Sequence, residues 1–213
     1  MSYTAKDIRN VCLLGHSGTG KTSLVESMLY MTGSIDRLGK VTEGNTVCDS
    51  DPEEAKRQIS ISLAVAPVKF KGCKINVLDT PGYFDFSGEV MEGLRVADAG
   101  IIVGSAKGGL SVGTEKAWKY LQERNMPRAI YIAKTDEENG DFNGAWQTLR
   151  EKFGRSVCPV MMPLWDEDKH IETLLDIVYR RAYQLEGKRR KEVPIPADKQ
   201  DVVDELYLEF LSR

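Results

Sequence analysis

The chain has 213 residues, enough for one hydrophobic core with a small second unit. Its formal net charge of -3 argues against a surface built as a whole for nucleic acid, so no direct sequence-specific nucleic-acid binding is expected. The longest apolar runs are strand-sized, and residues 1–7 lack the apolar core of a signal peptide. We therefore expect a cytoplasmic protein with no membrane partner.

Cysteine and histidine are sparse and widely spaced, so the sequence offers no spacing typical of a zinc site. We interpret the cysteines as buried or half-buried thiols in a reducing compartment. The cysteines are Cys12, Cys48, Cys73 and Cys158, and the histidines are His16 and His170.

A glycine-rich stretch follows a short apolar strand at 10–14 and opens a helix predicted from Lys21 to about Thr32. Its spacing, GxxxxGKT, is typical of a phosphate-binding loop, because glycines and a helix N-terminus bring backbone N–H groups to one anion. Lys21 supplies a charge for the β- and γ-phosphates, and Thr22 a hydroxyl for Mg²⁺. The predicted phosphate contacts are Gly15, His16, Ser17, Gly18, Thr19, Gly20, Lys21, Thr22 and Ser23.

A long polar stretch, Ser34 to Ser60, follows the first helix and is typical of a functional or mobile loop. Asp51 and Pro52 predict a short helix inside it, ending near Gln58. A strand is then predicted from Ile59 to Phe70, with a turn at 71–72 and a returning strand over 73–78. These two strands form an antiparallel hairpin at a sheet edge.

Strand and helix patterns alternate through the middle of the chain, which predicts an α/β fold with a mostly parallel sheet and helices on both faces. In such a fold the functional loops gather at the carboxyl ends of the strands. Helices are predicted over 87–97, 114–125 and 141–153, strands over 100–103 and 129–133, and a further apolar segment over 157–164.

The character of the sequence changes after about Trp165. The pattern predicts a short helix over 171–179, two strands over 180–185 and 192–195, and an amphipathic helix that begins at 196–198.

Two further motifs follow predicted strands. In Asp79-Thr80-Pro81-Gly82 the carboxylate can hold a water on Mg²⁺, and the Gly82 N–H can reach a γ-phosphate. In Lys134-Thr135-Asp136 the acid can accept from N1 and N2 of guanine, while the lysine stem covers the base. An adenine lacks the matching donors, so the pattern favours a guanine nucleotide.

These motifs, in this order, resemble the translational GTPases, and most closely the G domain of elongation factor G and its relatives. Segments 8–10, 57–61, 95–98 and the strand before Lys134 extend the resemblance over nearly the whole chain. It implies a P-loop GTPase fold that uses GTP or GDP with Mg²⁺ and meets the ribosome through the full-length protein. It also implies a G domain over 1–160, without its last strand and guanine loop, and the start of an insertion subdomain over 161–213.

Four positions depart from the family pattern. Ala133 replaces an asparagine that binds the base and braces the phosphate loop. Ser60 aligns with the family threonine on Mg²⁺ and keeps its hydroxyl, so the implied metal residues are Thr22, Ser60 and Asp79. Tyr83 replaces the histidine that orients the attacking water, and Gly18 replaces an acidic residue. The pattern fits an elongation factor G-like paralogue.

The leading hypothesis is a Mg²⁺-dependent GTPase module of a ribosome-associated, elongation factor G-like protein, with Lys21 and Tyr83 as catalytic candidates. The alternative is a GTP-binding switch with little turnover, and Tyr83 is the position that separates the two. A small-molecule P-loop kinase would not explain the stretch from Asp79 to Gly82 together with Lys134 and Asp136.

Overall fold

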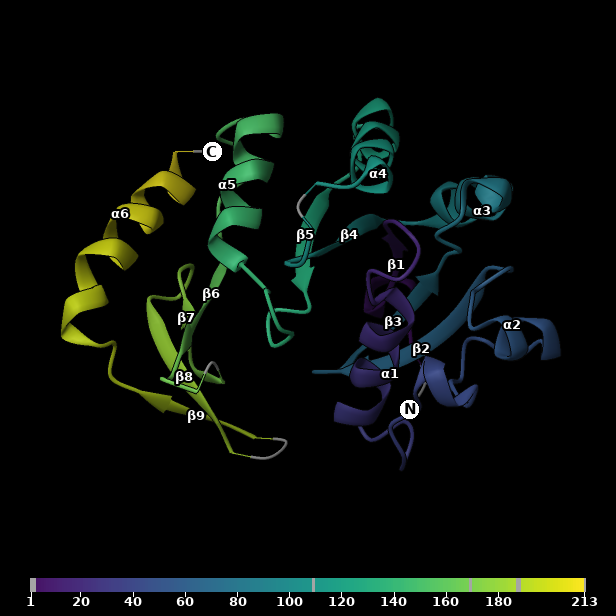
Figure 1. Ribbon diagram of the computed structural model, residues 1–213, viewed down its shortest axis with the longest axis horizontal. Coiled ribbons are helices and arrows are strands. Elements are labelled where there is room, and N and C mark those ends of the chain that lie inside the picture. The colour runs from purple at the N-terminus through teal and green to yellow at the C-terminus, as the bar shows by residue number, and fades with distance from the viewer. Residues whose placement is uncertain (1–2, 109, 169, 187–188, 213) are drawn as a thin grey trace. The chain divides into compact units, whose positions relative to one another are not determined.

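The computed structural model describes residues 3–108, 110–168, 170–186 and 189–212. The chain folds into two compact units, which divide between Lys134 and Thr135 (Figure 1). The predicted domain boundary between residues 160 and 161 concerns the family's domain division and stays a prediction. No helix among the described residues is long and apolar enough to cross a membrane.

The first unit is built on a five-stranded sheet in the order β2-β3-β1-β4-β5. In it β2 and β3 pair antiparallel, and the other neighbours are parallel, as the sequence predicted. The strands are β1 (Ile8–Leu14), β2 (Ala64–Phe70), β3 (Cys73–Asp79), β4 (Ala99–Ser105) and β5 (Arg128–Ala133). The helices are α1 (Lys21–Met31), α2 (Pro52–Arg57), α3 (Ser87–Val96) and α4 (Val112–Glu123), with 3₁₀ turns at Ala5–Asp7, Val41–Glu43 and Phe84–Phe86.

Two hydrophobic cores lie on opposite faces of this sheet. Successive residues of β1 point to opposite faces, so buried Cys12 belongs to one core and buried Leu13 to the other. The Cys12 core packs α3 and α4 through Leu94 and Leu121, and the Leu13 core packs α1 through Val25. Helices therefore cover both faces, and the predicted α/β class is confirmed.

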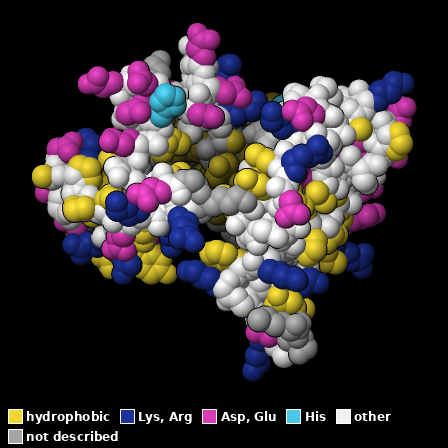
Figure 2. Space-filling view, turned by 90° about the horizontal axis from the view of Figure 1, so that it is seen from below, with side chains coloured by type: hydrophobic (Ala, Val, Ile, Leu, Met, Phe, Trp, Pro, Cys, Tyr) yellow, Lys and Arg dark blue, Asp and Glu magenta, His cyan; other side chains and the backbone are white. Residues whose placement is uncertain are grey.

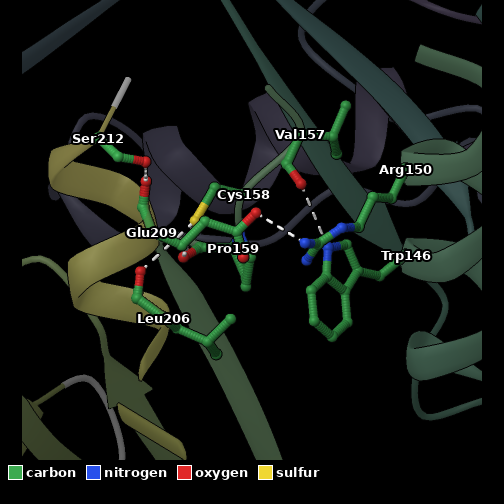
Figure 3. A network of polar contacts seen from close by, with 8 residues as sticks. All are labelled: Trp146, Arg150, Val157, Cys158, Pro159, Leu206, Glu209 and Ser212. Atoms are coloured by element: carbon green, nitrogen blue, oxygen red, sulfur yellow. Dashed lines mark hydrogen bonds and ion pairs between the residues drawn. The ribbon is translucent and has the colours of Figure 1, made fainter. Parts of the chain in front are cut away.

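The second unit is a four-stranded antiparallel sheet in the order β6-β7-β8-β9, with two long helices. Buried Leu175, Ala182 and Leu206 belong to its core. An ion pair of 2.7 Å between Arg150 and Glu209 joins the two helices (Figure 3). The elements are α5 (Phe142–Phe153), β6 (Met161–Trp165), β7 (Ile171–Asp176), β8 (Arg181–Glu186), β9 (Arg189–Val193) and α6 (Gln200–Leu211), with a 3₁₀ turn at Ala197–Lys199.

Two predicted elements differ from the structure. The helix predicted over 171–179 is wrong, because residues 171–176 form β7, whose backbone pairs with strands on both sides, and residues 177–179 form a turn. The strand predicted from Ile59 begins only at Ala64. In the intervening residues the Ile61 and Ser62 N–H groups donate to a buried carboxylate of Glu54, so they have a partner without a strand.

Charged side chains of both signs are interspersed over the face shown in Figure 2. This mixture agrees with the small net charge of the chain. It gives no support for an extended surface of one sign.

Candidate nucleotide-binding site

The predicted phosphate loop connects the end of β1 to the start of α1. Gly15 and Gly20 have φ values of 142° and 101°, where residues with a side chain are strained. A Cβ at Gly15 would also run into the carbonyl of Val103. Because the first N–H groups of a helix have no partner within it, the start of α1 offers donors to an anion.

Lys21 is buried against the loop that precedes it. Its ammonium donates to the carbonyls of Gly15, at 3.1 Å, and His16, at 3.0 Å, which leaves one of its three N–H groups for a ligand. Burial lowers the pKa of Lys21 to about 8, although the nearby Asp79 and Asp49 carboxylates oppose that change. Burial disfavours the charged form of Lys21, and a bound polyanion would stabilise that charge, so the position fits a polyanion site.

The three predicted metal residues meet beside Lys21. The Thr22 hydroxyl donates to Asp79 Oδ2 at 2.7 Å and lies 3.2 Å from the Ser60 hydroxyl. Burial raises the pKa of Asp79 to about 6, against the opposing effects of the Thr22 hydrogen bond and Lys21. Its second oxygen, Oδ1, is buried without a hydrogen-bond partner among the described residues.

This donor set fits Mg²⁺. The ion prefers hard oxygen ligands, and it is commonly held by one or two protein groups together with water and substrate phosphates. The orphaned Asp79 Oδ1 supplies an acceptor that no other described residue uses. Within the described part of the chain, no cluster of three or more His, Cys, Asp or Glu side chains could hold a metal ion.

Asp49 is a site residue that the sequence reasoning missed. Its Oδ1 accepts from the Ser60 hydroxyl at 2.8 Å, and its Oδ2 accepts from the Thr46 hydroxyl at 3.0 Å. It therefore holds Ser60 beside Thr22. The only signal in the sequence was its place in the long polar stretch, which does not distinguish it from the other acids there.

Two more buried carboxylates hold the segment between α1 and β2, here called switch I (residues 34–63). Glu26 accepts from the Gly39 N–H at 3.0 Å and the Val47 N–H at 2.5 Å. Glu54 accepts from three backbone N–H groups, those of residues 51, 61 and 62, at 2.9–3.1 Å. The polar stretch is thus an ordered loop whose backbone donors have side-chain partners.

Replacing Glu54 by Gln should destabilise the protein by about 1–3 kcal/mol, because the new amide group would place N–H donors against backbone N–H donors. Chemical or thermal unfolding of the two proteins measures the difference. Glu53→Gln is the matched control, since the Glu53 side chain is about half exposed and pairs with Arg57 on the surface. Equal stability of the Glu54 variant and wild type would contradict the assigned role.

The turn after β3 lies directly against the phosphate loop. The Thr80 hydroxyl donates to the Leu13 carbonyl and fixes the turn to β1. A Cβ built on Gly82 would lie 2.5 Å from the Ser17 amide nitrogen and 2.6 Å from Lys21 Nζ. Glycine is thus needed where the turn meets the predicted phosphate donors. With Pro81 and Gly82, the partly exposed Tyr83 lines a small pocket of about 30 Å³.

The remaining predicted residues are placed as follows. A Cβ on Gly20 would lie 3.7 Å from the Ala133 Cβ, so Ala133 lies beside the phosphate loop. Lys134 has a left-handed backbone, with φ of 61°. Thr135 and the exposed Asp136 belong to the second unit, and their part in base recognition stays a prediction. Gly18 and Ser23 are exposed, and buried Thr19 donates its hydroxyl to the His16 carbonyl.

Comparison with known proteins agrees with this geometry. An elongation factor G-like protein of Mycobacterium tuberculosis is 39% identical over 192 residues, which cover 90% of this chain and 26% of that protein. Elongation factor G of Mycoplasma genitalium is 32% identical over 205 residues, covering 95% and 30%. A crystal structure of a protein from Thermus thermophilus has a TM-score of 0.89 at 36% identity and covers 96% of this chain and 31% of that one.

The chain therefore spans about a quarter to a third of the length of these relatives. A family model of the elongation factor Tu GTP binding domain matches residues 6–211. The resemblance that the motifs predicted is confirmed, and the chain belongs to the family of the elongation factor Tu GTP binding domain.

Proposed function

We propose that this chain is the Mg²⁺-dependent GTP-binding and GTP-hydrolysing module of an elongation factor G-like translation factor that acts on the ribosome. The observation that carries the proposal is the meeting of Lys21, Thr22, Ser60 and Asp79 at the start of α1. The names and lengths of the relatives support the ribosome as partner of the whole protein.

Different residues of the site are proposed to bind the phosphates, the metal ion and the base. The loop amides and the Lys21 ammonium bind the phosphates, and Thr22, Ser60 and Asp79 hold Mg²⁺ directly or through water. When bound, the ion neutralises charge that develops on the phosphate oxygens. Asp49 keeps the Ser60 hydroxyl in place. Lys134 and Asp136 hold the guanine base.

A second candidate is a GTP-binding switch with little turnover, and the residue after Gly82 favours it. A tyrosine at this position has one hydroxyl and, unlike a histidine, no ring nitrogen with which to orient a water. Single-turnover hydrolysis with and without ribosomes separates the two functions.

The Asp136→Asn variant should shift the preference of the chain from guanine to xanthine nucleotides. The carboxylate accepts from the N2 amino group of guanine, whereas the C2 oxygen of xanthine needs a donor, which asparagine supplies. Competition calorimetry with GDP, XDP and ADP measures the change, with Glu137→Gln as a neighbouring control. Wild-type protein that binds ADP as well as GDP would refute the guanine assignment.

A further inference from the structure

Phe84 connects three elements of the first unit. Its ring lies at a tilt against the His16 ring of the phosphate loop, with centroids 5.9 Å apart. On α4, the Lys116 ammonium lies 3.6 Å from the centroid of the same ring. Phe84 begins the 3₁₀ turn that leads into α3. We call this group, Phe84 with His16 and Lys116, the clamp.

The start of α4 is packed closely enough to hold the clamp together. A Cβ on Gly113 would lie 2.7 Å from the backbone of His16, so α4 contacts the phosphate loop one turn before Lys116. Because both supports of the Phe84 ring are fixed to each other, the ring itself is held. These contacts are needed to fix the ring, because Phe84 is 42% exposed and burial alone would not hold it in place.

Gly82, two residues before Phe84, occupies the space beside the predicted phosphate donors. Its backbone lies so close to the Ser17 amide and Lys21 Nζ that even a methyl group would not fit. A terminal phosphate that reached the same two donors would have to move Gly82 outward. A diphosphate, which ends one phosphate earlier, reaches Lys21 through its β-phosphate and places no group between Lys21 and Gly82.

We propose that the clamp sets the preference of this site between nucleoside diphosphate and triphosphate. By holding Phe84 between His16 and Lys116, the clamp keeps Gly82 close to Lys21. Triphosphate binding must therefore displace the clamp, and diphosphate binding need not. Phe84 is thus a positioning residue. The inference rests on the proposed guanine-nucleotide site and adds its selectivity.

The test measures the affinities of GDP and a non-hydrolysable GTP analogue, with Mg²⁺, by calorimetry on the whole chain. Phe84→Leu and, separately, Lys116→Met should tighten binding of the analogue by about three- to tenfold relative to GDP, the size expected for contacts of this kind. Phe84→Tyr keeps the ring and should keep the wild-type ratio. The Lys116 variant is the sharper one, because the loss of a cation alone would weaken the triphosphate more than the diphosphate.

Phe70 and Lys71 offer a matched control. Lys71 Nζ lies 5.4 Å from the Phe70 ring at the turn between β2 and β3, at the opposite end of β3 from Asp79. Phe70→Leu and Lys71→Met should leave the ratio unchanged. An unchanged ratio in the Phe84 and Lys116 variants, with both nucleotides bound, would overturn the clamp alone. Wild-type protein that binds neither nucleotide would overturn the proposed function and the clamp together.

NMR spectra of His16 report on the clamp without a measurement of GTP hydrolysis. The chain has two histidines, and His170 is exposed in the second unit, so it serves as an internal reference for His16 in NMR spectra. The His16 ring signals should shift on addition of the GTP analogue more than on addition of GDP, and Phe84→Leu should remove the difference. Equal shifts with both nucleotides in wild-type protein would overturn the proposal.

Discussion

The Asp79→Asn variant should be more stable than wild type in the absence of nucleotide and should bind nucleotide with Mg²⁺ more weakly. Burial raises the pKa of Asp79 to about 6 from an ordinary value of 3.8, so ionising it in the folded protein costs about 3 kcal/mol. Asparagine removes that cost. Lys21 loses an attracting charge at the same time, which offsets part of the gain, so we expect a net gain of about 1–3 kcal/mol at pH 7.

The stability difference between Asp79→Asn and wild type should depend on pH in a definite direction. A carboxyl whose pKa is raised in the folded state contributes stability that is fully present below pH 3.8 and is lost as the pH rises through about 6. The difference between Asp79→Asn and wild type should therefore grow between pH 3.8 and 6. Unfolding by urea at about pH 4 and about pH 7 measures it.

Glu54→Gln provides a contrast of opposite sign. Both acids are buried, but Glu54 accepts hydrogen bonds from three backbone N–H groups, whereas Asp79 Oδ1 has no hydrogen-bond partner in the described part of the chain.

Loss of the Asp79 carboxylate should also weaken Mg²⁺-dependent nucleotide binding by roughly ten- to a hundredfold, which is the contribution expected of a hydrogen bond to a charged group. An Asp79→Asn protein that is less stable than wild type at pH 7 would contradict this account.

Local signals in the sequence were sufficient for the parts of the site that the chain builds within a few residues. The spacing of Gly15, Gly20 and Lys21 predicts both the turn and the helix that follows, because left-handed glycines and a helix N-terminus are local requirements. The same holds for the hairpin of β2 and β3, whose turn contains Gly72 with positive φ. The structure therefore contains the turn, the helix and the hairpin that the local sequence predicts.

The buried carboxylates could not be predicted in this way. Glu26 lies on a helix face, and its partners are N–H groups 13 and 21 residues further along the chain. Nothing in a local pattern distinguishes such an acid from a solvated one. Glu54 in the same way accepts from the Ile61 and Ser62 N–H groups, which is why the strand predicted from Ile59 starts late.

The second unit shows a different limit. Ile171, Leu174 and Leu175 have the i, i+3, i+4 spacing of a helix, and the pattern alone favours one. The structure instead buries Thr173 and Leu175 on one face of a strand between two neighbours. Pairing with β6 and β8 overrides local preference here, because short apolar runs fit either period.

Replacing Tyr83 by His in the full-length protein should raise the rate of GTP hydrolysis on ribosomes, by up to roughly 10²–10⁴-fold if a positioned acid–base group is what the site lacks. The ring position is suitable for such a role. Tyr83 directly follows Gly82, which lies against Lys21, and it lines the small pocket beside the phosphate loop. An imidazole there has a nitrogen that accepts from water and a second that donates, whereas a neutral phenol is a poor base.

Tyr83→Phe distinguishes the two proposed functions. If the hydroxyl orients a water, its loss should lower single-turnover hydrolysis, and the histidine variant should leave the rate flat or lower it. If the wild-type protein works as a switch, the phenylalanine variant should leave the slow rate unchanged, and only histidine should raise it. Nucleotide affinity, measured in parallel, should be similar in all three proteins, because the predicted phosphate contact at this turn is the Gly82 N–H rather than the Tyr83 side chain.

The intrinsic rate of the unmodified chain is the decisive baseline. Tyr83 is 43% exposed, so its side chain is a poorly fixed acceptor for the attacking water. Positioning is then left to the phosphate loop, Lys21 and the metal residues, and turnover without ribosomes should be very slow. Rapid ribosome-independent hydrolysis by the unmodified chain would show that the water is oriented by another group, and the argument for Tyr83 would fail.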